Sequence, residues 1–229
     1  MTTAEGWTAA VRDRLAPGRL LPLGEAGDGA WITERAARGV LGPAAAAVRG
    51  VVPGALRIGP DPLAGDDGAV PAGPLPVPPG GLGPGPLRIT ADFGAVAGRP
   101  LPDLAEELRA ALLGAARDGV GLRVTAADLR VTELLDAEPP ETGPAAPPPG
   151  RPAPATDDPV ALAVLRVEGV AGVTDTWGPP VHRGPDQVRV ELAVTAGRRP
   201  LDVARAARSA ATAAAGGATA VTVLVSELR

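Results

Sequence analysis

The chain of 229 residues lacks several side chains on which enzyme and metal chemistry usually depends. It has no cysteine and no lysine, and His182 is its single histidine. Disulfides, thiolate metal sites, cysteine nucleophiles and Schiff-base lysines are therefore excluded. Aromatic residues make up only 2% of the chain and the formal net charge is −4. A mildly acidic chain with so few stacking rings shows no sign of nucleic acid binding.

Long apolar runs are missing as well. No stretch approaches the roughly 18 residues that a membrane-spanning helix needs. Residues 1–15 lack the basic start and the apolar segment of a secretion signal. We therefore expect a cytoplasmic protein without direct membrane insertion.

Candidate catalytic and metal-binding groups are few. His182 could serve as a general base oriented by Asp186, but no serine or cysteine nucleophile accompanies it locally, and an ordinary loop histidine is the favoured interpretation. Ser209 and Ser226 both lie inside an apparent helix or strand. One histidine without cysteine cannot supply the three or four ligands of a zinc site. The sequence thus predicts no catalytic residue, no metal and no cofactor.

Proline and glycine are abundant instead, with 28 and 31 residues, and they concentrate in two segments. Proline fixes the backbone angle φ and lacks an N–H group, so neither segment can form a helix interior or a central strand. We interpret residues 59–86 as a disordered loop inside a domain. Residues 137–158 are predicted to be a proline-rich linker.

Helical spacing predicts a short helix at 7–15, which the following "GRLLPLG" ends. A second helix should begin at Asp28 as its N-cap, and Pro43 should kink or split it. A short strand is expected at 55–58. After the loop, "LRITADF" at 87–93 alternates as a half-buried strand does.

The next helix, opened by Pro102, recurs in altered form farther along the chain. Residues 97–112 and 196–211 are identical at seven of sixteen positions. A strand precedes and a strand follows each of these helices. We therefore predict an α+β fold with two copies of a small two-layer helix-strand-strand-helix-strand unit. In each copy the strands that flank the helix should be parallel, and the earlier strand should form an antiparallel hairpin.

The predicted organisation has four parts. They are an N-terminal helix and lead-in at 1–27, a first module at 28–136, the linker at 137–158 and a second module at 159–229. Neither module is rich in large apolar residues, so we expect the two modules to pack against each other.

Several motifs resemble the alkaline shock protein family of bacterial envelope stress proteins. They are the "V-x-G-V" turns at 48–51 and 167–170, "L-P-D-L-A-x-x-L" at 101–108 and "G-L-x-V" at 121–124. The resemblance covers about two thirds of the chain, most clearly 32–51, 87–93, 101–113 and 121–134. The whole chain is also similar to actinobacterial proteins labelled after a nucleopolyhedrovirus P-ten protein.

The resemblance implies a non-enzymatic adaptor or scaffold in a membrane-peripheral envelope stress assembly. It also implies protein partners, namely an alkaline shock homologue and a small membrane anchor protein. The duplication, the 59–86 loop and the 7–15 helix depart from the family pattern. A chain with these departures could cap or complete an assembly.

Two charged helix faces are the candidate partner-binding surfaces, although ordinary solvated faces are the favoured interpretation. The first face is acidic and the second is basic. The residues are Asp103, Glu106, Glu107, Arg198, Arg199, Arg205 and Arg208. The alternative function is a small-ligand-binding module that uses the cleft between the two units, with Arg183, His182 or Trp177 at its rim.

Overall fold

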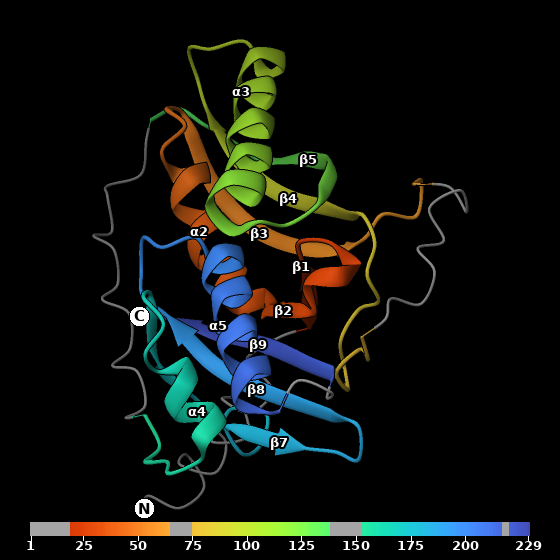
Figure 1. The fold of residues 1–229 in the computed structure, drawn as a ribbon. Helices are drawn as coiled ribbons and strands as arrows, with labels where there is room; N and C mark the ends of the chain where they lie inside the picture. Colours follow the sequence, from red (N-terminus) through yellow and green to blue (C-terminus); the bar gives the residue numbers. More distant parts are fainter. Residues whose placement is uncertain (1–18, 65–74, 138–152, 217–219) are drawn as a thin grey trace, which may run out of the picture.

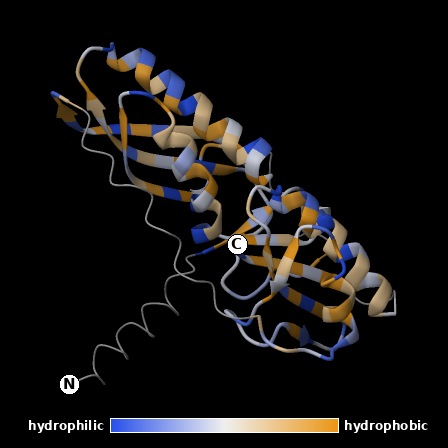
Figure 2. Cartoon of the chain, turned by 90° about the vertical axis from the view of Figure 1, so that its left-hand side faces the viewer, coloured by the Kyte–Doolittle hydropathy of each residue, from blue (hydrophilic) through white to orange (hydrophobic). Residues whose placement is uncertain are grey.

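The structure, a computed structural model, describes residues 19–64, 75–137, 153–216 and 220–229 (Figure 1). The expected 7–15 helix and most of the expected linker lie outside these residues. The described chain is a mixed α+β protein with a six-stranded sheet, a three-stranded sheet and four α-helices. Figures 1 and 2 show the two sheets and their helices lying end to end.

The first unit contains the three-stranded sheet, in the order β3-β4-β5. Its elements are α2 (Glu34–Ala46), β3 (Val51–Pro60), β4 (Leu87–Val96), α3 (Leu101–Gly114) and β5 (Val124–Leu135). The expected alternation in β4 is confirmed, because Leu87, Ile89 and Phe93 are buried. As expected, β3 is antiparallel to β4, and β5 is parallel to it.

The second unit follows the same order with one extra strand. Its elements are α4 (Pro159–Val164), β6 (Val170–Val173), β7 (Val181–Arg183), β8 (Gln187–Val194), α5 (Pro200–Ala214) and β9 (Ala220–Leu228). Both β6 and β7 are antiparallel to β8, and β9 is parallel to it. The prediction that the strands flanking the helix are parallel is therefore confirmed in both units.

The register of the two parallel strand pairs is the same. In the first unit, Phe93 lies opposite Val131, and a bulge places the next β4 residue, Gly94, opposite Glu133. In the second unit, Leu192 lies opposite Val225, and a bulge places Ala193 opposite Glu227. By this register, position 129 in β5 corresponds to 223 in β9.

The N-terminal segment differs from the prediction. A hairpin of β1 (Leu20–Leu23) and β2 (Ala30–Thr33) stands where the sequence indicated a helix end and the start of a helix at Asp28. Strand β2 pairs in parallel with β9, so it extends the six-stranded sheet of the second unit. All residues of both strands are buried. A strand covered on both faces has no period-2 alternation, and its sequence does not distinguish it from a buried helix.

Helix α2 therefore begins five residues later than expected. Thr33 is its N-cap, and the Thr33 hydroxyl accepts a hydrogen bond from the Ala36 N–H. Pro43 lies inside the last turn of one continuous helix, so the prediction of a split is wrong. Strand β3 also runs through Gly59 and Pro60, which were assigned to the loop.

A strap formed by residues 75–82 crosses the outer face of the six-stranded sheet. The Trp31 indole N–H donates to the Leu82 carbonyl, and the Leu82 N–H donates to the Leu20 carbonyl. Trp177 packs against the same apolar cluster of Leu20, Trp31 and Leu224. This part of the expected 59–86 loop therefore covers a hydrophobic surface.

One hydrophobic core joins the two units. Helix α2 contacts both β3 and β9, and a single buried cluster contains side chains from both sheets. Leu201 of α5 lies so close to Gly24 and Gly121 that a Cβ atom at either glycine would clash with it. The expectation that the two parts pack together is confirmed.

Candidate functional site

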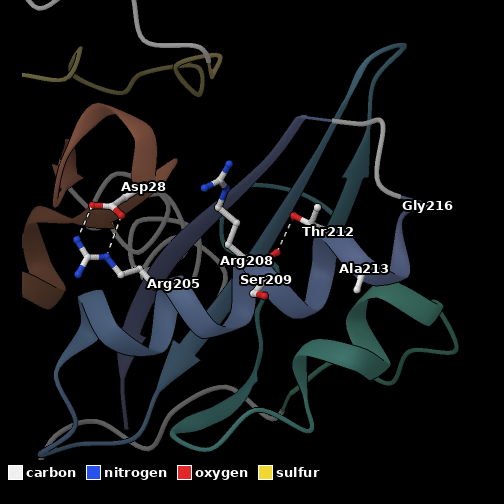
Figure 3. A pocket seen from close by; sticks show the side chains of 7 residues that line it. All are labelled: Asp28, Arg205, Arg208, Ser209, Thr212, Ala213 and Gly216. Carbon is white, nitrogen blue, oxygen red and sulfur yellow. Dashed lines mark hydrogen bonds and ion pairs between the residues drawn. The ribbon is translucent and has the colours of Figure 1, made fainter.

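Two arginines of α5 hold the β1–β2 hairpin against the second unit (Figure 3). The Arg205 guanidinium donates to both carboxylate oxygens of Asp28, at 2.8 and 2.9 Å. The Arg208 Nε donates to the Val221 carbonyl and its Nη1 to the Gly27 carbonyl, both at 2.9 Å. Arg208 thus bonds β9 and the segment that leads into β2 at the same time.

The Arg205–Asp28 pair affects the titration of both side chains. Burial raises the pKa of Asp28, but hydrogen bonds from Arg205 and from the Glu25 N–H outweigh it and leave the pKa below its ordinary value. The hydrogen bond to Asp28 raises the pKa of Arg205. The pair is therefore charged at neutral pH and fixes the hairpin on α5.

The other two arginines of the predicted basic face also have partners within the chain. Arg198 forms an ion pair with Glu168. Arg199 pairs with Asp202 and donates to the Arg117 carbonyl at 3.0 Å, which ties the start of α5 to the first unit. All four arginines of this face therefore make polar contacts within the chain.

The acidic face is more open. Asp103, Glu106 and Glu107 are all exposed on α3. Glu107 pairs with Arg99 at 2.7 Å, whereas the Glu106 side chain is 84% exposed and lies 3.7 Å from Arg109. The acidic face thus retains a carboxylate that an incoming group can reach.

Beside this face lies the outer edge of β5. Within the described residues, β4 is the only strand that pairs with β5. The Arg109 Nε donates to the Ala127 carbonyl of β5 at 3.3 Å. Val131 and Leu134 are exposed large apolar side chains of this strand, and 71% of Leu134 is accessible. An unpaired strand with exposed apolar side chains is a site for protein association.

A groove of about 660 Å³ runs along α5 (Figure 3). Asp28, Arg205, Arg208, Ser209 and Thr212 contribute to its lining. Asp28 and Arg205 already bond each other, and the Thr212 hydroxyl donates to the Arg208 carbonyl. The charged side chains of the groove are therefore used in bonds within the chain, and Arg208 bonds two backbone carbonyls.

The remaining candidates for chemistry do not converge. His182 is exposed in β7, and no hydrogen bond joins it to Asp186 in this described part of the chain. Arg183 pairs with Asp158 at the start of α4. Ser226 is buried and shares a hydrogen bond with Thr174. The structure therefore does not join His182 to Asp186, the acid that would orient it as a general base.

The carboxyl group of Glu191 is buried, which the sequence does not reveal. Glu191 is 1% exposed and accepts hydrogen bonds from the Thr174 hydroxyl and from the N–H groups of Thr176 and Trp177. These bonds fix the loop that follows β6. An isolated acid within the alternating strand "VRVELAV" was the only available signal, and it equally fits an exposed position.

A scan of protein-family models, a search of curated proteins and a search of solved structures each found no match. None of the helices in the described part of the chain has both the length and the hydropathy to span a bilayer. Across the same residues, no three His, Cys, Asp or Glu side chains gather as they would around a metal ion.

Proposed function

We propose that this protein is a non-enzymatic cytoplasmic adaptor in a membrane-peripheral envelope stress assembly. Its partners would be an alkaline shock homologue and a small membrane anchor protein. The motifs that resemble the alkaline shock family support this proposal, because they form the turn, the helix and the strands of the first unit.

We also propose that the chain is a tandem duplication of this family's module. The shared register and bulge of β4–β5 and β8–β9 support it. The two "V-x-G-V" turns offer further support. In the first turn, the Val51 N–H donates to the Val48 carbonyl and the Val96 N–H to the Gly50 carbonyl. In the second turn, the Val170 N–H donates to the Val167 carbonyl and the Thr195 N–H to the Gly169 carbonyl.

One observation carries the adaptor proposal: the last strands of the two units, β5 and β9, differ in what lies along the edge that faces away from β4 or β8. The edge of β9 is covered by β2, whereas the described residues leave the edge of β5 open beside the acidic face of α3. A strand that lacks the neighbour its counterpart has is suited to pairing with a segment of a second protein.

Affinity capture of the tagged full chain from its own cells tests this function. After alkaline or cell-wall stress, we expect to recover the alkaline shock homologue and the membrane anchor protein. Neutralising the acidic face with Asp103→Asn, Glu106→Gln and Glu107→Gln should reduce the recovery severalfold. Asp157→Asn, Asp175→Asn and Asp186→Asn remove the same charge from exposed positions in and just before the second unit, and they should leave the recovery unchanged. Failure to recover either partner under both stresses would contradict the proposal.

A further inference from the structure

We propose that the free edge of β5 binds an extended segment of a partner protein in parallel, with a basic residue of that segment facing Glu106. The bound segment would pair with β5 of the first unit as β2 pairs with β9 of the second unit. This docking surface rests on the proposed adaptor function, and the contacts that point to it lie within this chain.

As the first step, the register of β2 on β9 indicates which residues of β5 a new strand would meet. In the second unit, β2 pairs with β9 at Ala30↔Val223, Trp31↔Leu224 and Ile32↔Val225, and the Val223 N–H donates to the Gly29 carbonyl. The corresponding residues of β5 are 129–131. The Leu129 N–H should therefore point away from β4 and be available to a new strand.

The second step concerns Arg109, which lies at this edge. Arg109 occupies the position on α3 that Arg208 occupies on α5, and its Nε bonds the Ala127 carbonyl just as the Arg208 Nε bonds the Val221 carbonyl. Arg208 keeps this bond while β2 is attached, and its Nη1 donates to the incoming Gly27 carbonyl. The bond from Arg109 to Ala127 therefore does not block a new strand at the β5 edge. The guanidinium of Arg109 can also donate a hydrogen bond to that strand, as Arg208 does to Gly27.

The third step gives the chemistry of the partner. Glu106 of α3 corresponds to Arg205 of α5, which binds Asp28. Asp28 lies two residues before Ala30, the first residue of β2. A strand that docks on β5 should therefore carry arginine or lysine at that point, because an acid there would face the Glu106 carboxylate.

The apolar side chains agree with this placement. In the second unit, Ile32 of β2 lies beside Val225, and both are fully buried. Val131 corresponds to Val225 but is 37% exposed. An apolar side chain at the Ile32 position of the partner would cover Val131 as Ile32 covers its neighbour.

Labelled synthetic peptides test the inference with the full-length protein. One peptide has the native sequence 19–34, and the other carries Asp28→Arg. The β9 edge already holds its own β2, whose effective concentration within the chain is high, so neither peptide should bind there. We expect wild-type protein to bind the arginine peptide about fivefold more tightly, as one exposed ion pair allows.

Charge reversal then identifies the contact. The Glu106→Arg variant should prefer the native Asp28 peptide, whereas Asp175→Arg, an equal charge change on the second unit, should keep the wild-type preference. Binding of the arginine peptide should also slow hydrogen exchange at the Leu129 amide.

Equal binding of both peptides to wild-type and Glu106→Arg protein would overturn the inference. A dimer that forms through β5 and binds neither peptide would overturn it in favour of a second copy. Neither result depends on which proteins are captured from cells.

Discussion

Leu201 offers a direct test of how the two units are joined. Its side chain is 4% exposed and lies against Gly121 of the first unit and Gly24 of the hairpin. Leu201→Ala removes three buried carbon atoms, for which the transfer free energy is about 2.4 kcal/mol. The glycines cannot extend into the space, so a cavity cost adds to this value, and we expect a loss of about 3 kcal/mol in the free energy of unfolding.

Urea denaturation followed by two probes gives the measurement. In a Trp7→Phe background, tryptophan fluorescence reports on Trp31 and Trp177 of the six-stranded sheet and its loops, and far-ultraviolet circular dichroism reports on the helices of both units. Because Leu201 packs against both units, both transitions should move together to lower urea. Leu63→Ala, at a side chain that is 77% exposed, should change the free energy by less than about 0.5 kcal/mol. If Leu201→Ala costs no more than this control, or shifts only one probe, then Leu201 does not couple the units.

Three further predictions concern polar contacts. Hydrogen bonds from Thr125 and Arg88 lower the pKa of Asp61 to about 2, so its stabilising effect is complete above the ordinary pKa of 3.8 and is lost as the pH falls through 2. Thr125→Val should raise the midpoint of Asp61 in an NMR titration, and an unchanged midpoint would refute the role of the hydroxyl. Glu191→Ala leaves two N–H groups without an acceptor and should lower the free energy of unfolding by about 3 kcal/mol in urea, more than Glu191→Gln does. A double-mutant cycle on Asp28 and Arg205 should give a coupling of about 1 kcal/mol that weakens in salt, whereas zero coupling would show that the pair does not hold the hairpin.

The sequence predicted those elements that have one buried face. Leu87, Ile89 and Phe93 of β4 alternate with polar residues, and the helix opened by Pro102 carries a regular leucine stripe, so periodicity alone located both. Their parallel connection followed from the handedness of strand–helix–strand crossovers. The β1–β2 hairpin escaped prediction because it is buried on both faces. Its pairing with β9 also joins residues almost 200 positions apart, which no local pattern encodes.

The features of the candidate site also divide into those that the sequence identified and those that only the structure reveals. The sequence identified Asp103, Glu106 and Glu107 as exposed acids, and the structure places them so. It could not reveal what the basic face does, because the partners of Arg208 are backbone carbonyls, and every residue type provides those. Only a tertiary structure shows which carbonyls an arginine can reach.

The charge difference between α3 and α5 has a physical explanation in this arrangement. On α5, Arg205 and Arg208 face a segment of the same chain that carries Asp28, so the basic charge is used within the fold. On α3, Arg109 keeps the bond to the strand carbonyl, while an acid replaces the arginine that would face the added segment. If Glu106 were only a solvated surface residue, either charge would be tolerated at its position. Reversing that charge would then leave the preference between the Asp28 and Asp28→Arg peptides unchanged. A reversed preference in Glu106→Arg would instead mean that the two units select added strands of opposite charge, which disfavours the hairpin of one molecule at β5 of another by about fivefold.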